Sequence, residues 1–405
     1  MAEVVIIGLG YIGLPTSALI AKNKIKVHGV DISEYVVNTI NSGKIHIVEP
    51  DLENVVKETV QEGYLVASTL PVPSNTYIIV VPTPFKDNFA PDISFVQKAI
   101  EKITPLLKAE DLIIIESTSP VGTTEKMLEL INVKRPDLIN KVFMAYCPER
   151  VLPGNVLFEL THNDRVIGGI DQPSTEKAIK FYSKFVSGEL HGTNARTAEM
   201  CKLVENASRD AQIAFANELS MICDKAEINV WELIELANKH PRVNILKPGP
   251  GVGGHCIAVD PYFIVSDFPK EAQLISKSRK INNYKKDWCV AKILEKIRDF
   301  ESKNNRKPKI SCFGLAFKPN IDDLRESPAK EIVHTLKTQL RDYDFYITEP
   351  NIKTHLNFKL ENVDDAVKKA DIAILLVAHE KFRNLEFNQG TICLDFCGIL
   401  EQNRS

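Results

Sequence analysis

A glycine-rich stretch that ends at Cys256 carries the sharpest chemical signal in the sequence. It reads PGPGVGGHC, with glycines at 249, 251, 253 and 254, and Asp260 follows four residues after the cysteine. Backbone without side chains can wrap a phosphate or a sugar. A thiolate beside a positive partner, such as Lys202 or a nicotinamide ring, can act as a nucleophile.

A lone cysteine is more often a small buried apolar residue than a nucleophile. We apply that interpretation to Cys201, Cys223 and Cys312, and keep the nucleophile hypothesis for Cys256 because a glycine loop precedes it. His255 is interpreted as structural, since no carboxylate is spaced to orient it as a base.

Three polar residues, Lys202, Asn206 and Arg209, recur at i, i+4 and i+7 and therefore share one face of a helix. Most such triples are solvent-exposed faces. Here the surrounding sequence is largely apolar, so a face directed toward a site is at least as good an interpretation.

The motif Gly8-Leu9-Gly10-Tyr11-Ile12-Gly13 follows the first strand-like run and opens a helix. Its glycines permit a tight turn and a close approach of backbone to a pyrophosphate at the helix N-terminus. Asp31 ends the second strand-like run, 18 residues after Gly13. A carboxylate there accepts hydrogen bonds from ribose hydroxyls and repels a 2′-phosphate, so the pattern predicts NAD rather than NADP.

Polar segments follow further predicted strands, at the edge where a parallel sheet binds its ligands. They are VPTP (81–84), ESTSP (116–120) and YCPER (146–150), and Glu149 and Arg150 can serve catalysis and anion binding. Turns and a solvated ion pair are the alternatives. Near the C-terminus, Lys318 and Arg325 lie in GLAFKPNIDDLRESP (314–328), which suggests a second anionic ligand such as a nucleotide diphosphate, or else ordinary surface charge.

The elements that position these residues form an α/β pattern. Short runs rich in Val and Ile are typical of strands covered on both faces of a parallel sheet; they are 4–7, 27–30, 77–81, 112–116 and 142–145, and later 309–315, 344–347, 372–377 and 391–395. A long helix is predicted over 196–227 and another over 271–297. We therefore predict two Rossmann-like doubly wound lobes joined by a long central helix and a helical middle domain, with boundaries at 1–192, 193–302 and 303–405.

Composition excludes several classes of protein. The chain has 405 residues with 50 Lys and Arg against 53 Asp and Glu, a net charge of −3, so no overall basic field attracts nucleic acid or membrane. No apolar stretch reaches 18 residues, and a strand begins almost at Met1, so neither a membrane span nor a signal peptide is predicted. Eight scattered cysteines without a CxxC pair indicate reduced thiols and a cytoplasmic protein.

Taken together, these motifs resemble the UDP-glucose/GDP-mannose dehydrogenase family, in order and over essentially the whole chain. The matching segments are GLGYIGLP, VPTPF, ESTSPVGTTEKM, YCPERVLPGN, NDRVIGG, TAEMCKLVENASRD, HPRVNILKPGPGVGGHCIAVDP and GLAFKPNIDDLRESPA. CPERVLPG, HPRVNIL and GHCIAVDP are most similar to members that oxidise UDP-N-acetyl-D-mannosamine. UDP-N-acetyl-D-glucosamine or UDP-glucose is the alternative substrate.

The resemblance implies an NAD-dependent four-electron oxidation of a sugar C6 alcohol to a carboxylate. Cys256 would be the nucleophile that forms a thiohemiacetal and then a thioester. Lys202 would be an acid/base or oxyanion stabiliser and Asn206 a donor, Asp260 and Glu149 would position water and relay protons, and Thr118 would lie beside the nicotinamide.

The resemblance also implies binding residues. Substrate contacts would come from Arg150, Val151, Lys202, Asn206, Arg209, His240, Gly253, Phe317 and Lys318, and cofactor contacts from Gly8, Gly10, Tyr11, Ile12, Gly13, Asp31, Thr83, Thr118, Thr124 and Arg325. Arg242 would reach the substrate of a neighbouring subunit, which implies a homodimer through the long helix. One departure is Cys397, before Gly398, where the family usually carries a basic residue that contacts substrate; no metal is implied.

Two other functions compete with this hypothesis. A two-electron 3-hydroxyacid or 6-phosphogluconate-type dehydrogenase shares the dinucleotide domain, but it needs neither a nucleophilic Cys256 nor a second nucleotide-binding lobe. A non-catalytic NAD-binding regulator or scaffold would leave Cys256, Lys202 and Asn206 dispensable.

Overall fold

The computed structural model describes residues 2–86, 90–151, 154–254 and 256–400. They form two compact units, the first made of 1–205 with 262–267 and the second of 206–261 with 268–405. Each unit is described by itself. The predicted division into three parts stays a prediction.

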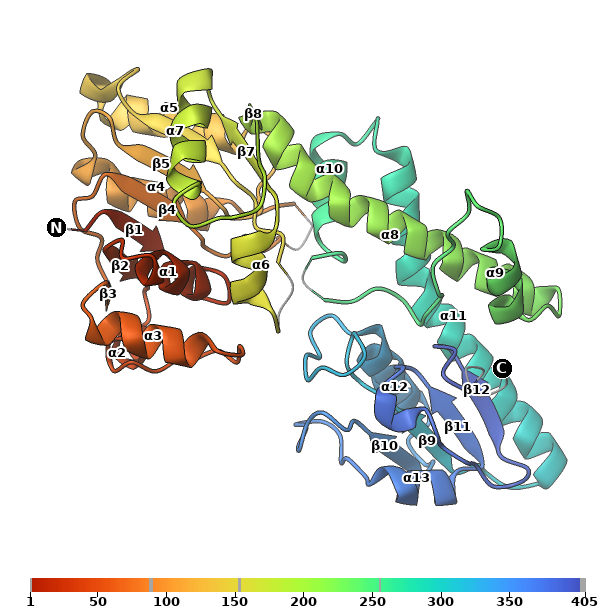
Figure 1. The fold of residues 1–405 in the computed structure, drawn as a ribbon. Helices are drawn as coiled ribbons and strands as arrows, with labels where there is room; N and C mark the ends of the chain where they lie inside the picture. The colour runs from red at the N-terminus through yellow and green to blue at the C-terminus, as the bar shows by residue number, and fades with distance from the viewer. Residues whose placement is uncertain (1, 87–89, 152–153, 255, 401–405) are drawn as a thin grey trace. The chain divides into compact units, whose positions relative to one another are not determined.

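The first unit is built on an eight-stranded sheet of order β3-β2-β1-β4-β5-β6-β7-β8. Its strands are β1 (Val4–Ile7), β2 (Val27–Val30), β3 (Leu65–Ser68), β4 (Thr76–Ile79), β5 (Leu112–Ile115), β6 (Phe143–Tyr146), β7 (Arg165–Gly169) and β8 (Leu190–Asn194) (Figure 1). The first six follow the order of a dinucleotide-binding sheet. Neighbouring strands are parallel except β6 and β7, which pair antiparallel.

Helices cover both faces of this sheet. They are α1 (Gly13–Lys22), α2 (Glu34–Asn41), α3 (Leu52–Gln61), α4 (Ser94–Ile103), α5 (Thr123–Lys134), α6 (Val156–His162) and α7 (Gln172–Tyr182), with short 3-10 turns η1 (Thr104–Leu106) and η2 (Pro136–Leu138). One apolar cluster contains side chains of α1, α3 and α7, and the other contains those of α4 and α5. Strands β1, β4 and β5 are buried along their whole length, which explains their unbroken apolar sequences.

The five strands expected in this unit are confirmed to within a few residues, but β3, β7 and β8 were not predicted. Strand β8 reads LHGTN and is partly exposed, and β7 ends in two glycines, so neither has the continuous apolar run that marks a buried strand.

The second unit contains a four-stranded parallel sheet of order β10-β9-β11-β12. Its strands are β9 (Ile310–Phe313), β10 (Phe345–Thr348), β11 (Ile372–Leu375) and β12 (Ile392–Asp395). Helices α11 (Gln273–Asn304) and α12 (Pro328–Gln339) pack on one face, and α13 (Val363–Lys369) with η3 (Glu380–Phe382) on the other. The predicted fold class, two Rossmann-like α/β lobes with long helices between them in sequence, is confirmed.

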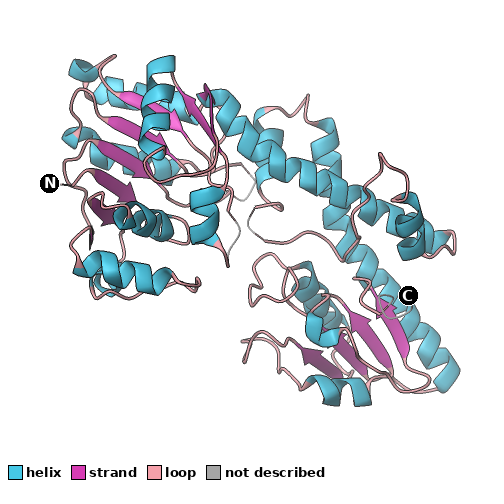
Figure 2. Cartoon of the chain, viewed as in Figure 1, coloured by secondary structure: helices cyan, strands magenta, loops and turns pink. Residues whose placement is uncertain are grey.

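The two longest described helices are α8 (Ala195–Lys225) and α11 (Figure 2). Helix α8 starts in the first unit and continues into the second, and α9 (Val230–Ala237) and α10 (Asp260–Asp267) follow it. The helix expected over 196–227 is confirmed, whereas α11 runs past the predicted end at 297. Among the described helices, none combines enough length with enough apolar sequence to cross a membrane.

Candidate active site

The three glycines of the first loop meet different demands. Gly8 has a φ of 98°, and a Cβ on it would lie 2.3 Å from the carbonyl oxygen of Val80, so the fold itself requires glycine there. Gly13 packs equally closely on the Gly8 carbonyl. A Cβ on Gly10 would meet nothing within 4 Å. The open space at Gly10, beside the start of α1, fits the close approach of a dinucleotide pyrophosphate.

Asp31 lies at the end of β2, where the sequence predicts the ribose contact. Its Oδ2 accepts a hydrogen bond from the Leu9 N–H (3.0 Å) and its Oδ1 accepts one from the Ser33 N–H (2.9 Å). The half-buried carboxylate therefore joins the second strand to the glycine loop. Each oxygen has a further lone pair for a ribose hydroxyl. Tyr11, in the glycine loop, is 55% exposed. These residues fit NAD.

The loops that carry Thr83 and Thr118 are joined by Ser117. The Ser117 hydroxyl accepts from the Val81 N–H (2.9 Å) and donates to the Val81 carbonyl (2.8 Å). Both threonines are half-buried at this edge of the sheet. Ser117 thus fixes the spacing of two segments that the sequence predicts to face the cofactor.

Thr124 is completely buried, and its hydroxyl donates to Oε1 of Glu199 (2.7 Å). The same carboxylate accepts from the backbone N–H groups of Gly122 and Thr124, at the N-terminus of α5. Burial raises the pKa of Glu199, although these donors oppose the shift. Sequence reasoning missed Glu199, whose signal was an acidic residue three positions before Lys202 on a helix face; Thr124 as a cofactor contact stays a prediction.

Glu149 forms a buried ion pair that the sequence did not predict. Its Oε2 lies 3.2 Å from the guanidinium of Arg165, and its Oε1 accepts from the N–H of Arg150. Arg165 also lies 4.0 Å from Oε1 of Glu116. Burial raises the pKa of Glu116 to about 7.

The remaining predicted residues of the first unit lie at or near its α8 end. Arg150 pairs with Glu205 of α8 (2.7 Å) and donates to the carbonyl of Asp164. Val151 and Lys202 are half-buried, and Lys202 lies on α8 between Glu199 and Glu205. This part of the helix therefore bonds to two of the predicted ligand-facing loops.

In the second unit, Cys256, Asp260 and Asn206 come together. The carbonyl of Cys256 accepts from the N–H groups of Val259 and Asp260, so the cysteine precedes α10 by one turn. The buried Asp260 carboxylate accepts from the side-chain amide of Asn206 (2.5 Å). Cys256 itself is exposed. An accessible thiol of this kind suits covalent chemistry.

Of the cysteines interpreted as core residues, Cys223 and Cys312 are buried. Cys201 is only half-buried, so that interpretation was wrong for it.

The glycine loop packs against the loop that follows β9. A Cβ on Gly253 would lie 2.8 Å from Cβ of Phe317, and one on Gly254 would touch the Phe317 ring. The Gly254 N–H donates to the carbonyl of Arg325. Close packing within the protein is therefore enough to require glycine at positions 253 and 254, whether or not a ligand binds. It also brings the predicted substrate contacts Gly253 and Phe317 together.

Several predicted contacts are exposed side chains of the second unit: Arg209, His240, Arg242, Lys318 and Arg325. Arg325 forms an ion pair with Asp323 (2.6 Å). The Arg242 N–H donates to Nδ1 of His240 (3.3 Å). His255 lies outside the described residues.

Cys397 lies in a turn that Asp395 holds. The Asp395 carboxylate accepts from the N–H groups of Cys397, Gly398 and Leu400, and the thiol lies 3.4 Å from it. Burial, together with this carboxylate, raises the pKa of Cys397 well above its ordinary value. A neutral thiol therefore stands where the family usually carries a cation.

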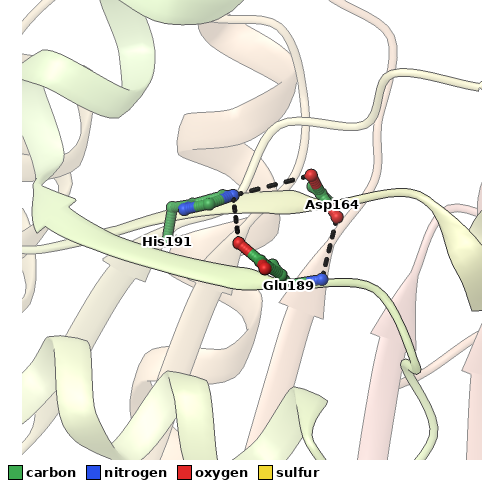
Figure 3. A group of neighbouring side chains, drawn as sticks. All are labelled: Asp164, Glu189 and His191. Atoms are coloured by element: carbon green, nitrogen blue, oxygen red, sulfur yellow. Dashed lines mark hydrogen bonds and ion pairs between the residues drawn. The ribbon is translucent and has the colours of Figure 1, made fainter.

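A group of Asp164, Glu189 and His191 lies on the surface of the first unit (Figure 3). Its ligand atoms are close enough to hold a metal ion, but all three side chains are more than half exposed. The contacts among them are surface ion pairs and one backbone hydrogen bond, so the group supports no metal assignment.

Comparison with known proteins agrees with this arrangement. Three domains of the UDP-glucose/GDP-mannose dehydrogenase family match the chain: the NAD binding domain at residues 2–186, the central domain at 196–284 and the UDP binding domain at 311–402. UDP-N-acetyl-D-mannosamine dehydrogenase from Campylobacter jejuni is 51% identical, over 98% of this chain and 99% of the relative. NDP-N-acetyl-D-galactosaminuronic acid dehydrogenase from Ralstonia nicotianae is 50% identical, over 98% and 96%.

Among solved structures, that of a UDP-N-acetyl-mannosamine dehydrogenase from Staphylococcus aureus superposes with a TM-score of 0.85. It is 39% identical and covers 99% of both chains. Similarity of this extent reaches the NAD binding and UDP binding domains alike. The chain therefore belongs to the UDP-glucose/GDP-mannose dehydrogenase family, as an NAD-dependent enzyme that acts on nucleotide sugars.

Proposed function

We propose that this enzyme oxidises the C6 alcohol of UDP-N-acetyl-D-mannosamine to the carboxylate, giving UDP-N-acetyl-D-mannosaminuronate. The observation that best supports this substrate is the 51% identity to the UDP-N-acetyl-D-mannosamine dehydrogenase of Campylobacter jejuni, over nearly the full length of both chains. The Ralstonia nicotianae relative is 50% identical, so nucleotide sugars with another N-acetylated epimer are alternative substrates. UDP-N-acetyl-D-glucosamine and UDP-glucose are alternative substrates as well.

The chemistry needs two oxidations joined by a covalent step. Two NAD+ molecules, bound in succession, each accept one hydride. After the first oxidation the Cys256 thiolate adds to the C6 aldehyde, so a C–S bond forms and the oxygen gains the electron pair and then a proton. The second oxidation turns this thiohemiacetal into a thioester. Water then adds to the thioester carbonyl, the C–S bond breaks, and the carboxylate leaves the regenerated thiol.

We propose supporting roles for residues in each unit. Asp260, one turn after Cys256 and bonded to Asn206, holds the Asn206 amide as a donor for a developing oxyanion. Lys202, one turn earlier on α8, supplies a cation or an acid/base. Glu149 at the end of β6 positions water, and Thr118 lies beside the nicotinamide.

Substrate binding is proposed for the residues on the loop after β9 and its neighbours. Phe317 and Gly253 offer a wall for the sugar nucleotide, and Lys318 offers a cation for the diphosphate. Arg150, Val151, Arg209 and His240 complete the predicted set.

We further propose a homodimer in which Arg242 reaches the neighbouring subunit's substrate. Helix α8 exposes Phe215 (57%) and Ile222 (56%), which are seven residues apart and so lie on one face. An apolar face of this kind suits helix packing against a second copy.

The experiment mixes purified enzyme with excess NAD+ and a limiting amount of UDP-N-acetyl-D-mannosamine, and counts the NADH formed per sugar. We expect two, with little NADH from the N-acetylglucosamine, N-acetylgalactosamine or glucose nucleotides. Turnover with another sugar alone would replace the substrate and keep the mechanism. One NADH per sugar would mean that the aldehyde is released, against the role of Cys256.

Cys256→Ser provides the direct test of the covalent step, with Cys393→Ser, an exposed cysteine of the same unit, as the matched control. The first variant should bind NAD and give at most one NADH per sugar, while the control should give two. Full activity of Cys256→Ser would instead favour a mechanism without a thioester.

A further inference from the structure

The segment NDRVIGG contains Arg165, to which the proposed reaction gives no role. Arg165 is the first residue of β7, and β7 pairs antiparallel with β6. A strand of reversed direction starts at the edge where its neighbours end. Arg165 therefore lies at the carboxyl edge of β5 and β6, beside the residues that follow these strands.

The guanidinium of Arg165 is buried, with only 4% of the side chain exposed, and it faces two carboxylates. It lies 3.2 Å from Glu149, which is 10% exposed, and 4.0 Å from Glu116, which is not exposed at all. Its second nitrogen donates to the Leu160 carbonyl, and the guanidinium lies over the Tyr182 ring. A buried cation shared in this way fixes the carboxylate that reaches toward solvent.

Apart from Glu149, the other titratable groups beside Arg165 and Glu116 are neutral. Burial raises the pKa of the Cys147 thiol to about 12 and that of the Tyr182 hydroxyl well above its ordinary value. The Tyr182 hydroxyl donates to Oε1 of Glu116 (2.6 Å), whereas Oε2 of Glu116 is buried without a hydrogen-bond partner among the described residues. A carboxylate oxygen in that position favours a bound proton, in line with the pKa of about 7 that burial gives Glu116.

Arg165 is thus the cation for two carboxylates, Glu149 at the edge of the sheet and Glu116 in the core. When Glu116 is protonated, the full charge of Arg165 acts on Glu149; when Glu116 is ionised, that charge is divided between them. A purely structural ion pair would have no reason to leave one oxygen of the second carboxylate, Oε2 of Glu116, without a hydrogen-bond donor among the described residues.

We propose that Arg165 is a positioning residue that holds the Glu149 carboxylate for the water-dependent step, and that Glu116 controls its effect by taking up or releasing a proton in the core. This inference rests on the proposed function, since it concerns the step assigned to Glu149. It assigns roles to two residues that touch neither substrate nor cofactor in that mechanism.

The test measures kcat, both KM values and the pH profile of kcat for the full-length enzyme and three variants: Arg165→Lys, Arg165→Gln and Glu116→Gln. Matched controls are Arg135→Lys, Arg135→Gln and Glu110→Gln, which alter exposed ion pairs of the same unit. Melting temperature and NAD binding report whether each variant folds.

Removing the cation should move the inflection of the Arg165→Gln profile up by about 1 pH unit, because Glu116 without the nearby cation binds its proton more tightly. Arg165→Lys should keep the inflection at its wild-type pH and lose about 10-fold in kcat, with KM values little changed, since lysine keeps the charge but lacks the planar guanidinium group. The wild-type profile should have an inflection near pH 7 that Glu116→Gln lacks. The controls should match the wild type.

Equal losses of kcat in the two Arg165 variants with an unshifted inflection, or an inflection that persists in Glu116→Gln, would overturn the inference and leave the proposed function standing. If Arg165→Gln does not fold, Arg165→Lys and Glu116→Gln decide alone. A wild-type protein that forms no NADH from any tested sugar would overturn the proposed function, and this inference with it.

Discussion

The two parallel sheets begin in the same way. Strand β1 is followed by Gly8 with a φ of 98° and Leu9, and β9 is followed by Gly314 with a φ of 96° and Leu315. In both, an acid at the end of the second strand accepts a hydrogen bond from the leucine N–H: Asp31 for Leu9 (3.0 Å) and Glu349 for Leu315 (2.8 Å).

The two acids then differ in what else they contact. Glu349 also accepts from the Ala316 N–H and pairs with Nε2 of the buried His379 (3.0 Å). Its carboxylate is therefore bonded to buried groups of the protein itself. Asp31 is half-buried, and its carboxylate accepts backbone hydrogen bonds from Leu9 and Ser33.

The helices differ as well. Helix α1 starts at Gly13, immediately after the glycine loop, while α12 starts at Pro328 after a longer loop that carries Lys318 and Arg325. We therefore expect one sheet edge to bind anions through backbone at a helix end, and the other through side chains on a loop. On this expectation, the same strand and turn geometry does not determine the mode of binding.

The sharpest way to break this comparison is to substitute its glycines. Gly8→Ala and Gly314→Ala each place a Cβ within 2.5 Å of neighbouring atoms at a positive φ, so each should destabilise by more than about 4 kcal/mol. Gly10→Ala should leave stability almost unchanged and weaken NAD binding about 10-fold or more, because only a ligand fills that space. Thermal melts and NAD titration measure both effects; equal melting temperatures for all three variants would contradict the prediction.

The acids provide the next test. Glu349→Ala leaves several buried donors without an acceptor and should cost about 3 kcal/mol. Asp31→Ala should lower the free energy of unfolding by only about 1 kcal/mol. It should reduce the affinity for NAD more than the affinity for any sugar nucleotide. Chemical denaturation and ligand titration compare the two. A stability loss as large for Asp31→Ala as for Glu349→Ala would show that both acids are structural.

The units should also respond oppositely to pH. Burial raises the folded-state pKa of Glu116 from 4.5 to about 7, so the folded state binds more protons between these values. This contribution to stability is therefore present at low pH and lost as pH rises from about 5 to 7, by roughly 2 to 3 kcal/mol. Glu349 has a lowered pKa, because bonds to His379 and the backbone outweigh its burial, so its contribution is lost as pH falls below 4.5.

Melting curves of Glu116→Gln and the wild type from pH 5 to 8 measure the first effect as a difference that changes with pH. A constant difference would mean that Glu116 does not titrate in this range.

The smallest expected effect on stability concerns the N-terminal caps of helices α1 and α12. The Ser327 hydroxyl caps α12 by accepting from the Lys330 N–H, whereas no side chain among the described residues caps α1. Ser327→Ala should lower stability by about 1 kcal/mol. A neutral result in a thermal melt would mean that the loop satisfies that N–H in another way.

Sequence patterns predicted the strands that are buried on both faces, because burial there demands continuous Val and Ile. They failed for β7 and β8, whose partners determine their pairing more than their own residues do. In the same way Cys256, Asn206 and Asp260 were found through glycine and helical spacing, while Glu199 had only a weak local signal, its position on the helix face of Lys202, and Arg165 had none. Their roles depend on backbone groups and carboxylates brought close only by the fold.

The sequence by itself determined two α/β lobes, the dinucleotide loop with Asp31, and the cysteine at the end of a glycine loop, since each depends on residues close together in the chain. Only the tertiary structure decided which glycines are required by packing and which leave room for a ligand. It also decided that one acid of a similar pair, Asp31, is half-buried, while the other, Glu349, is buried and bonded to a histidine. Those differences arise from atoms more than twenty residues apart, whose contacts no local pattern records.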